Sequence, residues 1–381
     1  MKIICFTGSS TTGNSETFIR KGIADMRKLG WTVEVVSGRR SGSGEGVHYT
    51  GFSESNWALQ IWRLFSFLNF SGYAKRYMKL GFEIRQWNAQ RKLKPIFKQD
   101  ADFYWFDYLN YACYAEKALK ESQTPYAIAI HGFDASQELS SRPLREAAKR
   151  LQPRFYVSPS NHLRRRLELL GVNRPIHVIP YDSVPARSGN SAKKYDFMAL
   201  GRLTPKKCPE GVLMAFEKVL EKHPDATLVW VGSGELEDEI KGRFSHLVEA
   251  HRVVFTGALE HNEAIEHFGM SDVFVQHSVT GYAGDQEGLP NSIVEAMRHG
   301  KPVVSTLHSG ISEIIFHNEN GLLVQEHDYE SFAEHMLLLL REESLRQKLG
   351  SAAKASIQES VPLESRGKKI EELIRGVVQK V

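Results

Sequence analysis

Two glutamates separated by seven residues, Glu287 and Glu295, offer the strongest candidate chemistry in the sequence. Between them lies Gly288-Leu289-Pro290-Asn291, in which Pro290 predicts the first turn of a helix and Gly288 allows a ligand close to the backbone. The free N–H groups at such a helix start favour an anion. Because carboxylates accept strongly from sugar hydroxyls, the spacing predicts a phosphate held between two sugar-binding acids. A helix with a merely solvated N-terminal acid has the same spacing.

A second candidate pair, Arg202 and Lys207, follows an apolar run that ends at Leu200. Arginine offers a planar fork for phosphate oxygens and lysine a point charge, so together they could neutralise a diphosphate leaving group. We identify no Asp-x-Asp sequence anywhere in the chain that could hold Mg²⁺ there. The alternative is a solvated surface pair, since exposed charges usually contribute little.

Two weaker candidates follow other apolar runs. His131 directly follows residues 127–130, and by itself it is as expected of a buried structural histidine, with Asp134 fixing the local loop. The loop 8–16 is rich in glycine and hydroxyl side chains, which suggests phosphate contact through Gly13 and Asn14. It is neither Gly-x-Gly-x-x-Gly nor followed by a Walker lysine. A further turn, 310–313, either faces the phosphates through backbone N–H groups or closes the sheet.

Apolar runs and helical stretches alternate along the chain and would position these residues. Continuous rather than alternating apolar runs indicate strands covered on both faces, hence parallel sheets. Segment 181–194 reads as an interdomain linker. We therefore predict two doubly wound α/β domains, 1–182 and 195–362, facing each other across a cleft, with a helix at 363–381 packing back on the first. Predicted strands are 3–6, 31–36, 127–130, 155–157, 178–179, 196–200, 227–231, 253–256, 273–276 and 303–305, and predicted helices include 15–29, 108–121, 140–151 and 160–170.

Composition excludes several classes of protein. The chain has 381 residues, of which 41% are hydrophobic and 25% charged, as in ordinary globular proteins of about two domains. Three scattered cysteines exclude a disulfide framework and a Cys-rich zinc site. There is no apolar run of about 18 residues and no cleavable signal pattern. We expect a reduced, cytoplasmic protein.

The segment 57–98 stands apart because it carries nine Lys and Arg residues against one acid, together with ten aromatic residues. One interpretation is a pair of helices whose aromatics fill the core of the first domain. The other is peripheral contact with the inner face of the cytoplasmic membrane, where aromatic rings and basic side chains favour anionic headgroups. A patch for nucleic acid or anionic polysaccharide would look similar, although we expect no nucleic-acid partner.

The motifs resemble those of the family-4 glycosyltransferases, retaining nucleotide-sugar enzymes with the two-domain GT-B fold. The hallmark of that family is the pair of glutamates found here at 287 and 295. The resemblance is specific over 196–345, looser over the N-terminal half, and closest to bacterial exopolysaccharide glycosyltransferases. Its segments are ALGRLTPKKCPEGVLMAF (199–216), VGSGELE (231–237), FTGALEH (255–261), GDQEGLPNSIVEAMRHGKPVVST (284–306), HSGISEII (308–315), NENGLLV (318–324) and, in the first domain, NSETFI (14–19).

The resemblance implies a metal-independent transferase without a cofactor. It assigns the pyrophosphate to Arg202 and Lys207, although Cys208 stands where the family usually has glycine. His131 would lie beside the transferred sugar, Glu287 would orient that sugar, and Glu295 would accept from the ribose hydroxyls. The donor would be a UDP-sugar, with GDP-mannose as its competitor, and the acceptor a glycan or a lipid-linked sugar.

Three other functions share parts of this pattern. A GT-B nucleotide-sugar epimerase would need carboxylates placed for proton abstraction or elimination. A nicotinamide dehydrogenase would also have two βα sheets, but no proper dinucleotide fingerprint is present. A non-catalytic sugar-nucleotide sensor is the third alternative, against which the retention of both glutamates and both cations argues.

Overall fold

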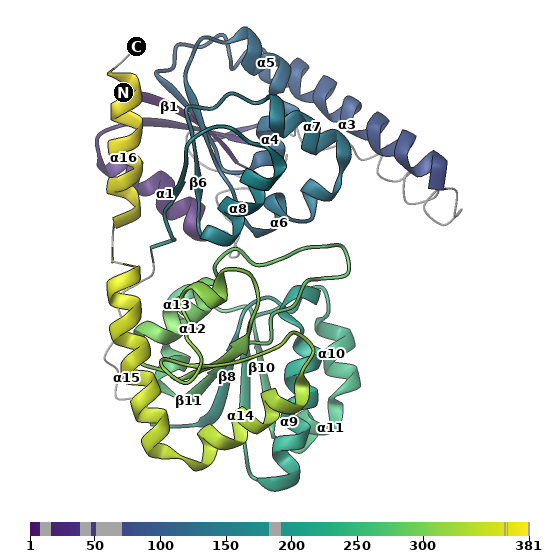
Figure 1. Cartoon of the computed structure of the whole chain (residues 1–381), viewed down its shortest axis with the longest axis vertical. Helices are drawn as coiled ribbons and strands as arrows, with labels where there is room; N and C mark the ends of the chain where they lie inside the picture. The colour runs from purple at the N-terminus through teal and green to yellow at the C-terminus, as the bar shows by residue number, and fades with distance from the viewer. Residues whose placement is uncertain are drawn as a thin grey trace. The chain divides into compact units, whose positions relative to one another are not determined.

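The structure is a computed structural model that describes residues 1–7, 17–38, 47–50, 71–182, 192–361, 363 and 365–379 (Figure 1). The chain divides into two compact units. Unit 1 comprises Met1–Ile179 and Arg366–Val381, and unit 2 comprises Pro180–Ser365. The chain therefore leaves unit 1 once and returns to it with its last helix.

Unit 1 is built on a parallel sheet of seven strands in the order β3-β2-β1-β4-β5-β6-β7. The order reverses beside β1, and in such sheets ligands bind beyond the carboxyl ends of the strands. Its strands are β1 (Lys2–Thr7), β2 (Thr32–Ser37), β3 (Val47–Tyr49), β4 (Phe103–Phe106), β5 (Tyr126–Ala129), β6 (Phe155–Ser158) and β7 (Ile176–Val178). Its helices are α1 (Thr17–Lys28), α3 (Ser71–Leu93), α4 (Leu109–Tyr114), α5 (Glu116–Glu121), α6 (Gly132–Ala135), η1 (Glu138–Ser140), α7 (Arg142–Arg150), α8 (Asn161–Leu170) and α16 (Ser365–Val378).

Unit 2 has a parallel sheet of six strands in the equivalent order, β10-β9-β8-β11-β12-β13. The prediction of two doubly wound α/β sheets is thus confirmed. The strands are β8 (Tyr195–Leu200), β9 (Leu228–Val231), β10 (Val253–Gly257), β11 (Ser271–Val275), β12 (Val303–Thr306) and β13 (Leu322–Val324). The helices are η2 (Pro205–Lys207), α9 (Pro209–Lys222), α10 (Glu237–Arg243), α11 (Ser245–Glu249), α12 (His261–Gly269), α13 (Asn291–Arg298), η3 (Ser309–Glu313), α14 (Tyr329–Arg341) and α15 (Glu343–Ser360).

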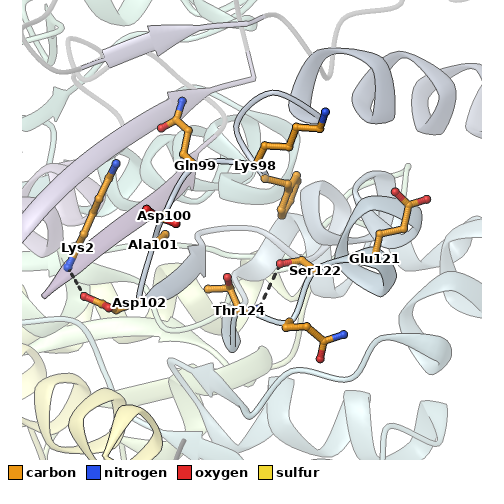
Figure 2. A pocket seen from close by; sticks show the side chains of 11 residues that line it. Lys2, Lys98, Gln99, Asp100, Ala101, Asp102, Glu121, Ser122 and Thr124 are labelled. Carbon is orange, nitrogen blue, oxygen red and sulfur yellow. Dashed lines mark hydrogen bonds between the residues drawn. The ribbon is translucent and has the colours of Figure 1, made fainter.

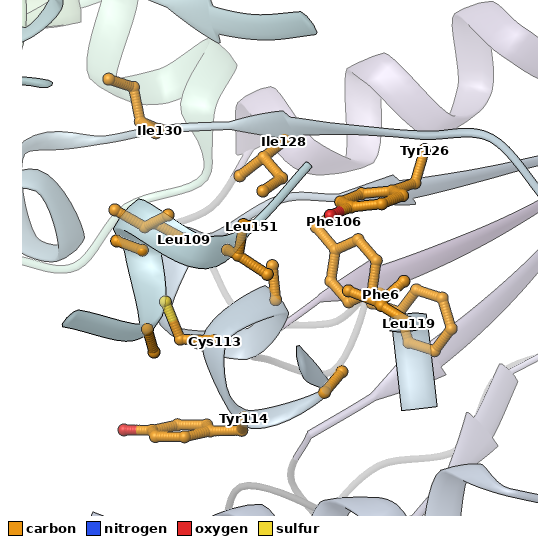
Figure 3. Close-up of a cluster of buried hydrophobic side chains, with 14 of the residues drawn as sticks. Phe6, Phe106, Leu109, Cys113, Tyr114, Leu119, Tyr126, Ile128, Ile130 and Leu151 are labelled. Atoms are coloured by element: carbon orange, nitrogen blue, oxygen red, sulfur yellow. The ribbon is translucent and has the colours of Figure 1, made fainter. Parts of the chain in front are cut away.

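Both faces of the unit 1 sheet are covered by apolar side chains, which explains the continuous apolar runs. Along β1, Ile4 and Phe6 join one buried cluster, while Ile3 and Cys5 join the cluster on the opposite face. Figure 3 shows the first of these clusters, in which the Phe6 ring stacks on Phe106 with 4.4 Å between centroids. The second cluster includes Ile370 and Ile374, so α16 packs on unit 1.

The sequence interpretation missed three strands, β3, β4 and β13. The most important is β4, which pairs with β1 on one side and β5 on the other, in the middle of the sheet. Its sequence, Phe-Tyr-Trp-Phe, is buried throughout. Aromatic residues favour strands as β-branched ones do, so this apolar run was a strand signal that the sequence interpretation did not use.

Helix α3 confirms in part that this segment fills the core of the first domain, whereas membrane contact stays a prediction. Phe82, Ala89 and Leu93 lie on one helical face and are buried in the unit 1 core. Leu80 and Trp87 project from the opposite face, where Trp87 is 60% exposed. The expectation for residues 57–70 falls outside the described residues. No helix in the described part of the chain is long and apolar enough to cross a membrane.

Candidate active site

The ends of four neighbouring strands, β8, β11, β12 and β13, carry the polar side chains of unit 2 that were singled out from the sequence, together with several that were not. The segment after β8 continues into Lys207, and the loop after β11 leads through Glu287 into α13. Since parallel strands all end at one edge, the fold itself gathers these residues. This edge is the candidate site.

Lys207 and Glu287 form the central contact of the site. The Lys207 Nζ lies 3.0 Å from Glu287 Oε1, and both side chains are largely buried. The Lys207 stem folds over Gly201, where an added Cβ would lie 3.1 Å from Lys207 Cε. Gly201 also has a φ of +149°, a backbone conformation that other residues rarely adopt. The glycine therefore makes room for the lysine.

The pKa values of this pair follow from burial and mutual attraction. Burial alone would raise the pKa of Glu287, but the charges of Lys207 and Lys206 outweigh it and bring that pKa to about 2. Burial lowers the pKa of Lys207, against the opposing effect of Glu287. The site therefore holds a fixed carboxylate and a cation with little access to water, which strengthens its hold on an anionic ligand.

Lys206, which the sequence interpretation did not assign, forms a second ion pair, with Asp285. Its Nζ lies 3.1 Å from Asp285 Oδ2, and its carbonyl oxygen accepts from the N–H of Val279 at 2.9 Å. The two lysines thus join the segment after β8 to the loop before α13. The sequence carried a signal for these pairs, namely two adjacent lysines, Lys206 and Lys207, and two acids separated by one residue, Asp285 and Glu287.

Arg202 is exposed, at the base of the same segment. Two glycines of the VGSGELE motif hold this segment in place, because a Cβ on Gly232 would meet Gly201 O at 2.3 Å and one on Gly234 would meet Leu203 O at 2.4 Å. The Trp230 indole N–H also donates to Gly201 O at 3.0 Å. These glycines therefore allow two loops to pack closely.

The start of α13 departs slightly from the sequence prediction. Pro290 is the N-cap, with Asn291 as the first helical residue, whereas the prediction placed Pro290 in the first turn. Leu289 is buried in an apolar cluster of unit 2 and anchors the turn. The N–H of Gly310 donates to Gly288 O at 3.1 Å, so the 310–313 turn is tied to the turn before α13.

Glu295 lies inside α13 in an apolar environment. The Nε2 atom of His261 lies 3.6 Å from Glu295 Oε1. Burial raises the pKa of Glu295 to about 8. In the unliganded chain it is therefore largely a neutral acid near pH 7, whereas the sequence interpretation assumed a carboxylate. A neutral acid can both donate to and accept from hydroxyl groups.

His308 and Glu326 were also missed by the sequence interpretation. The backbone N–H of Glu287 donates to His308 Nε2 at 3.1 Å, and His308 Nδ1 lies 2.6 Å from Glu326 Oε1. The other oxygen of Glu326 accepts from the N–H of Thr280 at 2.8 Å. These contacts tie the backbone at Glu287 to the ends of β12 and β13.

In unit 1, His131 lies at the carboxyl end of β5, as N-cap of the short helix α6. Its backbone N–H donates to Asp134 Oδ1 at 2.7 Å, and the other Asp134 oxygen accepts from the N–H of Leu109 at 2.7 Å. Burial, with a smaller effect of Arg366, lowers the pKa of His131 to about 3. The imidazole is neutral, and Asp134 holds the loop. Gly13 and Asn14 lie outside the described residues.

The chain has one Asp-x-Asp sequence, Asp100-Ala101-Asp102, which the sequence interpretation overlooked. It lies just before β4, at the amino ends of the unit 1 strands, beside a pocket of about 600 Å³ (Figure 2). Asp102 Oδ2 accepts from the N–H of Lys2 at 2.7 Å. Among the described residues, no group of three or more His, Cys, Asp or Glu side chains could hold a metal ion.

Comparison with known proteins identifies the second half of the chain. Residues 182–356 match the family model described as "Glycosyl transferases group 1". This part of the chain is a group 1 glycosyltransferase domain. It contains both glutamates, both predicted cations and the His308–Glu326 contact.

Two relatives illustrate the match. The amylovoran biosynthesis glycosyltransferase AmsK of Erwinia amylovora is 28% identical over 282 residues, which cover 70% of this chain and 67% of AmsK. A GDP-mannose-dependent monoacylated α-(1-6)-phosphatidylinositol monomannoside mannosyltransferase of Corynebacterium glutamicum is 28% identical over 175 residues, 46% of this chain and 45% of that protein. The second match therefore spans less than half of either chain.

Solved structures extend the likeness to the whole chain. Anabaena Alr3699/HepE, solved in complex with UDP-glucose, superimposes with a TM-score of 0.72 over 100% of both chains, at 16% identity. At this identity the likeness concerns the fold. The chain has the GT-B fold, as the sequence resemblance predicted.

Proposed function

We propose that the chain is a retaining glycosyltransferase of polysaccharide biosynthesis, which moves a hexose from a UDP-sugar to a glycan or lipid-linked acceptor. The observation that carries the proposal is the Lys207–Glu287 pair, 3.0 Å apart at the carboxyl edge of the unit 2 sheet, inside the matched domain. In our proposal this pair serves as the cation for the donor's diphosphate and the acid that orients its sugar.

The transfer breaks the bond between the anomeric carbon and the diphosphate oxygen and forms a bond from that carbon to the acceptor oxygen. Negative charge builds up on the leaving diphosphate, so preorganised cations and N–H dipoles lower the barrier. In our proposal Arg202, Lys207 and the start of α13 supply them. The acceptor attacks from the front face, and its proton passes to the leaving phosphate.

In this mechanism Lys207 exchanges its partner. In the unliganded chain its charge is neutralised by Glu287. When the donor binds, the diphosphate offers Lys207 a stronger partner, and the Glu287 carboxylate becomes available to accept from hydroxyl groups of the sugar. Glu295 contacts the ribose, and the role of His131 beside the transferred sugar stays a prediction.

We propose that no metal ion or cofactor takes part. Two observations support this. The proposed diphosphate site already has three positive groups, which are Arg202, Lys207 and the N-terminus of α13. The only Asp-x-Asp sequence of the chain lies elsewhere, at the amino ends of the unit 1 strands. UDP is preferred as the nucleotide because Alr3699/HepE was solved with UDP-glucose. GDP-mannose stays the competitor because a relative is named as dependent on it.

An assay of nucleotide release tests the function. The full chain is incubated with UDP-glucose, with and without glycan or lipid-linked acceptors, and released UDP and sugar products are quantified. We expect UDP release that increases with a suitable acceptor and a new glycosidic product with the donor's anomeric configuration. Conversion of UDP-glucose to another UDP-sugar without UDP release would show the epimerase instead. Tight donor binding with no turnover under any acceptor would show the sensor.

A second proposal concerns the membrane. The outer face of α3 carries Leu80, Trp87 and Arg91, with the Arg91 guanidinium 4.9 Å from the centroid of the Trp87 ring. Exposed apolar side chains beside basic ones suit the headgroup region of an anionic bilayer. We propose that this face brings the enzyme to a lipid-linked acceptor.

A further inference from the structure

The backbone at Glu287 is held by a chain of contacts that the proposed reaction does not itself use. His308 follows β12 and Glu326 follows β13, each by two residues. His308 Nε2 receives the N–H of Glu287 at 3.1 Å, and Glu326 Oε1 lies 2.6 Å from His308 Nδ1. Glu287 is therefore held twice, through its carboxylate by Lys207 and through its backbone by His308.

The contacts determine the tautomer of His308. A backbone N–H can only donate, so Nε2 must present its lone pair to Glu287. The proton then sits on Nδ1 and is donated to Glu326. The Ser309 hydroxyl, 3.2 Å from Nε2, can donate to the same lone pair. His308 is 1% exposed, so water does not substitute for these partners.

Backbone strain is concentrated at the same place. The described non-glycine residues with positive φ are Cys208, His251, Ser309, Asn318 and His327. Three of them, Cys208, Ser309 and His327, directly follow Lys207, His308 and Glu326, respectively. Such conformations cost on the order of 1–3 kcal/mol each and persist where the surroundings enforce them, most often at functional sites. The strain thus marks the residues that hold Glu287.

We propose that His308, oriented by Glu326, is the positioning residue that sets the Glu287 carboxylate against the donor sugar. The proposal rests on the proposed function of Glu287. A carboxylate displaced by about 1 Å from a reacting sugar can lose about 100-fold in rate, so a single lost hydrogen bond at its backbone is enough to matter. Binding of the nucleotide, which relies on other groups, is spared.

Two substitutions at His308 separate this role from simple structural support. In His308→Gln the side-chain amide reaches about as far as Nε2, so its oxygen can still receive the Glu287 N–H. In His308→Asn the shorter amide can still donate to Glu326 but cannot reach Glu287. We expect kcat for UDP release from UDP-glucose to fall by about 100-fold in His308→Asn and by at most about 10-fold in His308→Gln. UDP affinity should change by less than about twofold in both.

Controls keep the outcomes distinct. Glu326→Ala, at a partly exposed position, should lower kcat without changing UDP affinity, while Glu319→Ala, at an exposed acid earlier in the chain, should change neither. This pair also tests the proposal if His308→Asn fails to fold. Equal activity of the Asn and Gln variants, or higher activity of Asn, would overturn the positioning role. Glu287→Gln decides the underlying function: if it turns over normally, Glu287 is not the sugar-orienting acid. If it is inactive while both His308 variants match wild type, only the positioning proposal fails.

Discussion

Lys207 and Glu287 neutralise each other's charge where both are buried, so their contact should matter for stability as well as for the proposed catalysis. Removing one partner of a buried ion pair leaves an uncompensated charge and costs about 3 kcal/mol or more. Lys207→Ala should therefore lower the free energy of unfolding by about that amount in urea denaturation. Lys222→Ala, at the exposed end of α9, is the matched control and should have no effect. Identical urea midpoints for both variants would contradict the buried pair.

Substitutions of the two glutamates should differ in which ligand they affect. Glu287→Gln should impair turnover of the sugar donor but leave the affinity for free UDP nearly unchanged, because UDP lacks the transferred sugar. Glu295→Gln should weaken the binding of free UDP as well, since the ribose is common to donor and product. Titration calorimetry with UDP checks this. The division of roles is wrong if both variants lose the same affinity for UDP.

Glu295 also makes stability depend on pH. Its pKa in the folded chain is about 8, above the ordinary value of 4.5, so between these values the folded state holds a proton that the unfolded state has released. The free energy of unfolding should therefore fall as pH rises through this window. Glu287, whose pKa is lowered to about 2, contributes stability that is lost only as pH falls below 4.5.

Glu295→Gln should remove this dependence. Urea denaturation at about pH 6 and about pH 8 would show a smaller loss of stability in the variant than in wild type. The account of Glu295 as a buried neutral acid would be refuted by parallel losses in the two proteins.

Among the secondary-structure elements, the sequence predicted best those whose side chains are buried on both sides. Strands β1, β2, β6, β8 and β9 lie where apolar runs placed them, because burial on both faces leaves little polar alternation. The aromatic strand β4 carried the same signal but was not predicted. In the site, motif spacing predicted Glu287, Glu295, Arg202 and Lys207 as candidates. His308 and Glu326 could not be found that way, because their contacts join strand ends that are distant in sequence.

Helix α3 should bind the surface of an anionic membrane. The chain should co-sediment with phosphatidylglycerol vesicles at low salt and dissociate at high salt, since each basic residue near an anionic surface contributes about 1 kcal/mol. Trp87→Ser and Arg91→Gln should weaken binding. Leu169→Ser on α8 removes another exposed apolar side chain, 89% exposed, and should bind as wild type. If the wild-type chain stays in the supernatant at low salt, α3 is not a membrane-binding element.

Over the whole molecule, two sheets with equivalent strand order place chemistry-bearing residues at their carboxyl edges, His131 in unit 1 and the Lys207–Glu287 pair in unit 2. The doubly wound architecture was predictable because βα alternation restarts after residue 194. The partnership of Lys207 with Glu287 was not, because a motif reveals which residues matter but not which of them neutralise one another before a ligand arrives.

Titration of the full chain with UDP in the presence of EDTA tests the central claim most directly. We predict that UDP binds with the same affinity with and without EDTA, and at least about tenfold more weakly to Lys207→Gln, since a hydrogen bond to a charged group contributes about 1.5–3 kcal/mol. Lys222→Gln should bind UDP as wild type does. UDP binding that requires added Mg²⁺, or that survives Lys207→Gln unchanged, would contradict a metal-free diphosphate site at the carboxyl edge of the unit 2 sheet.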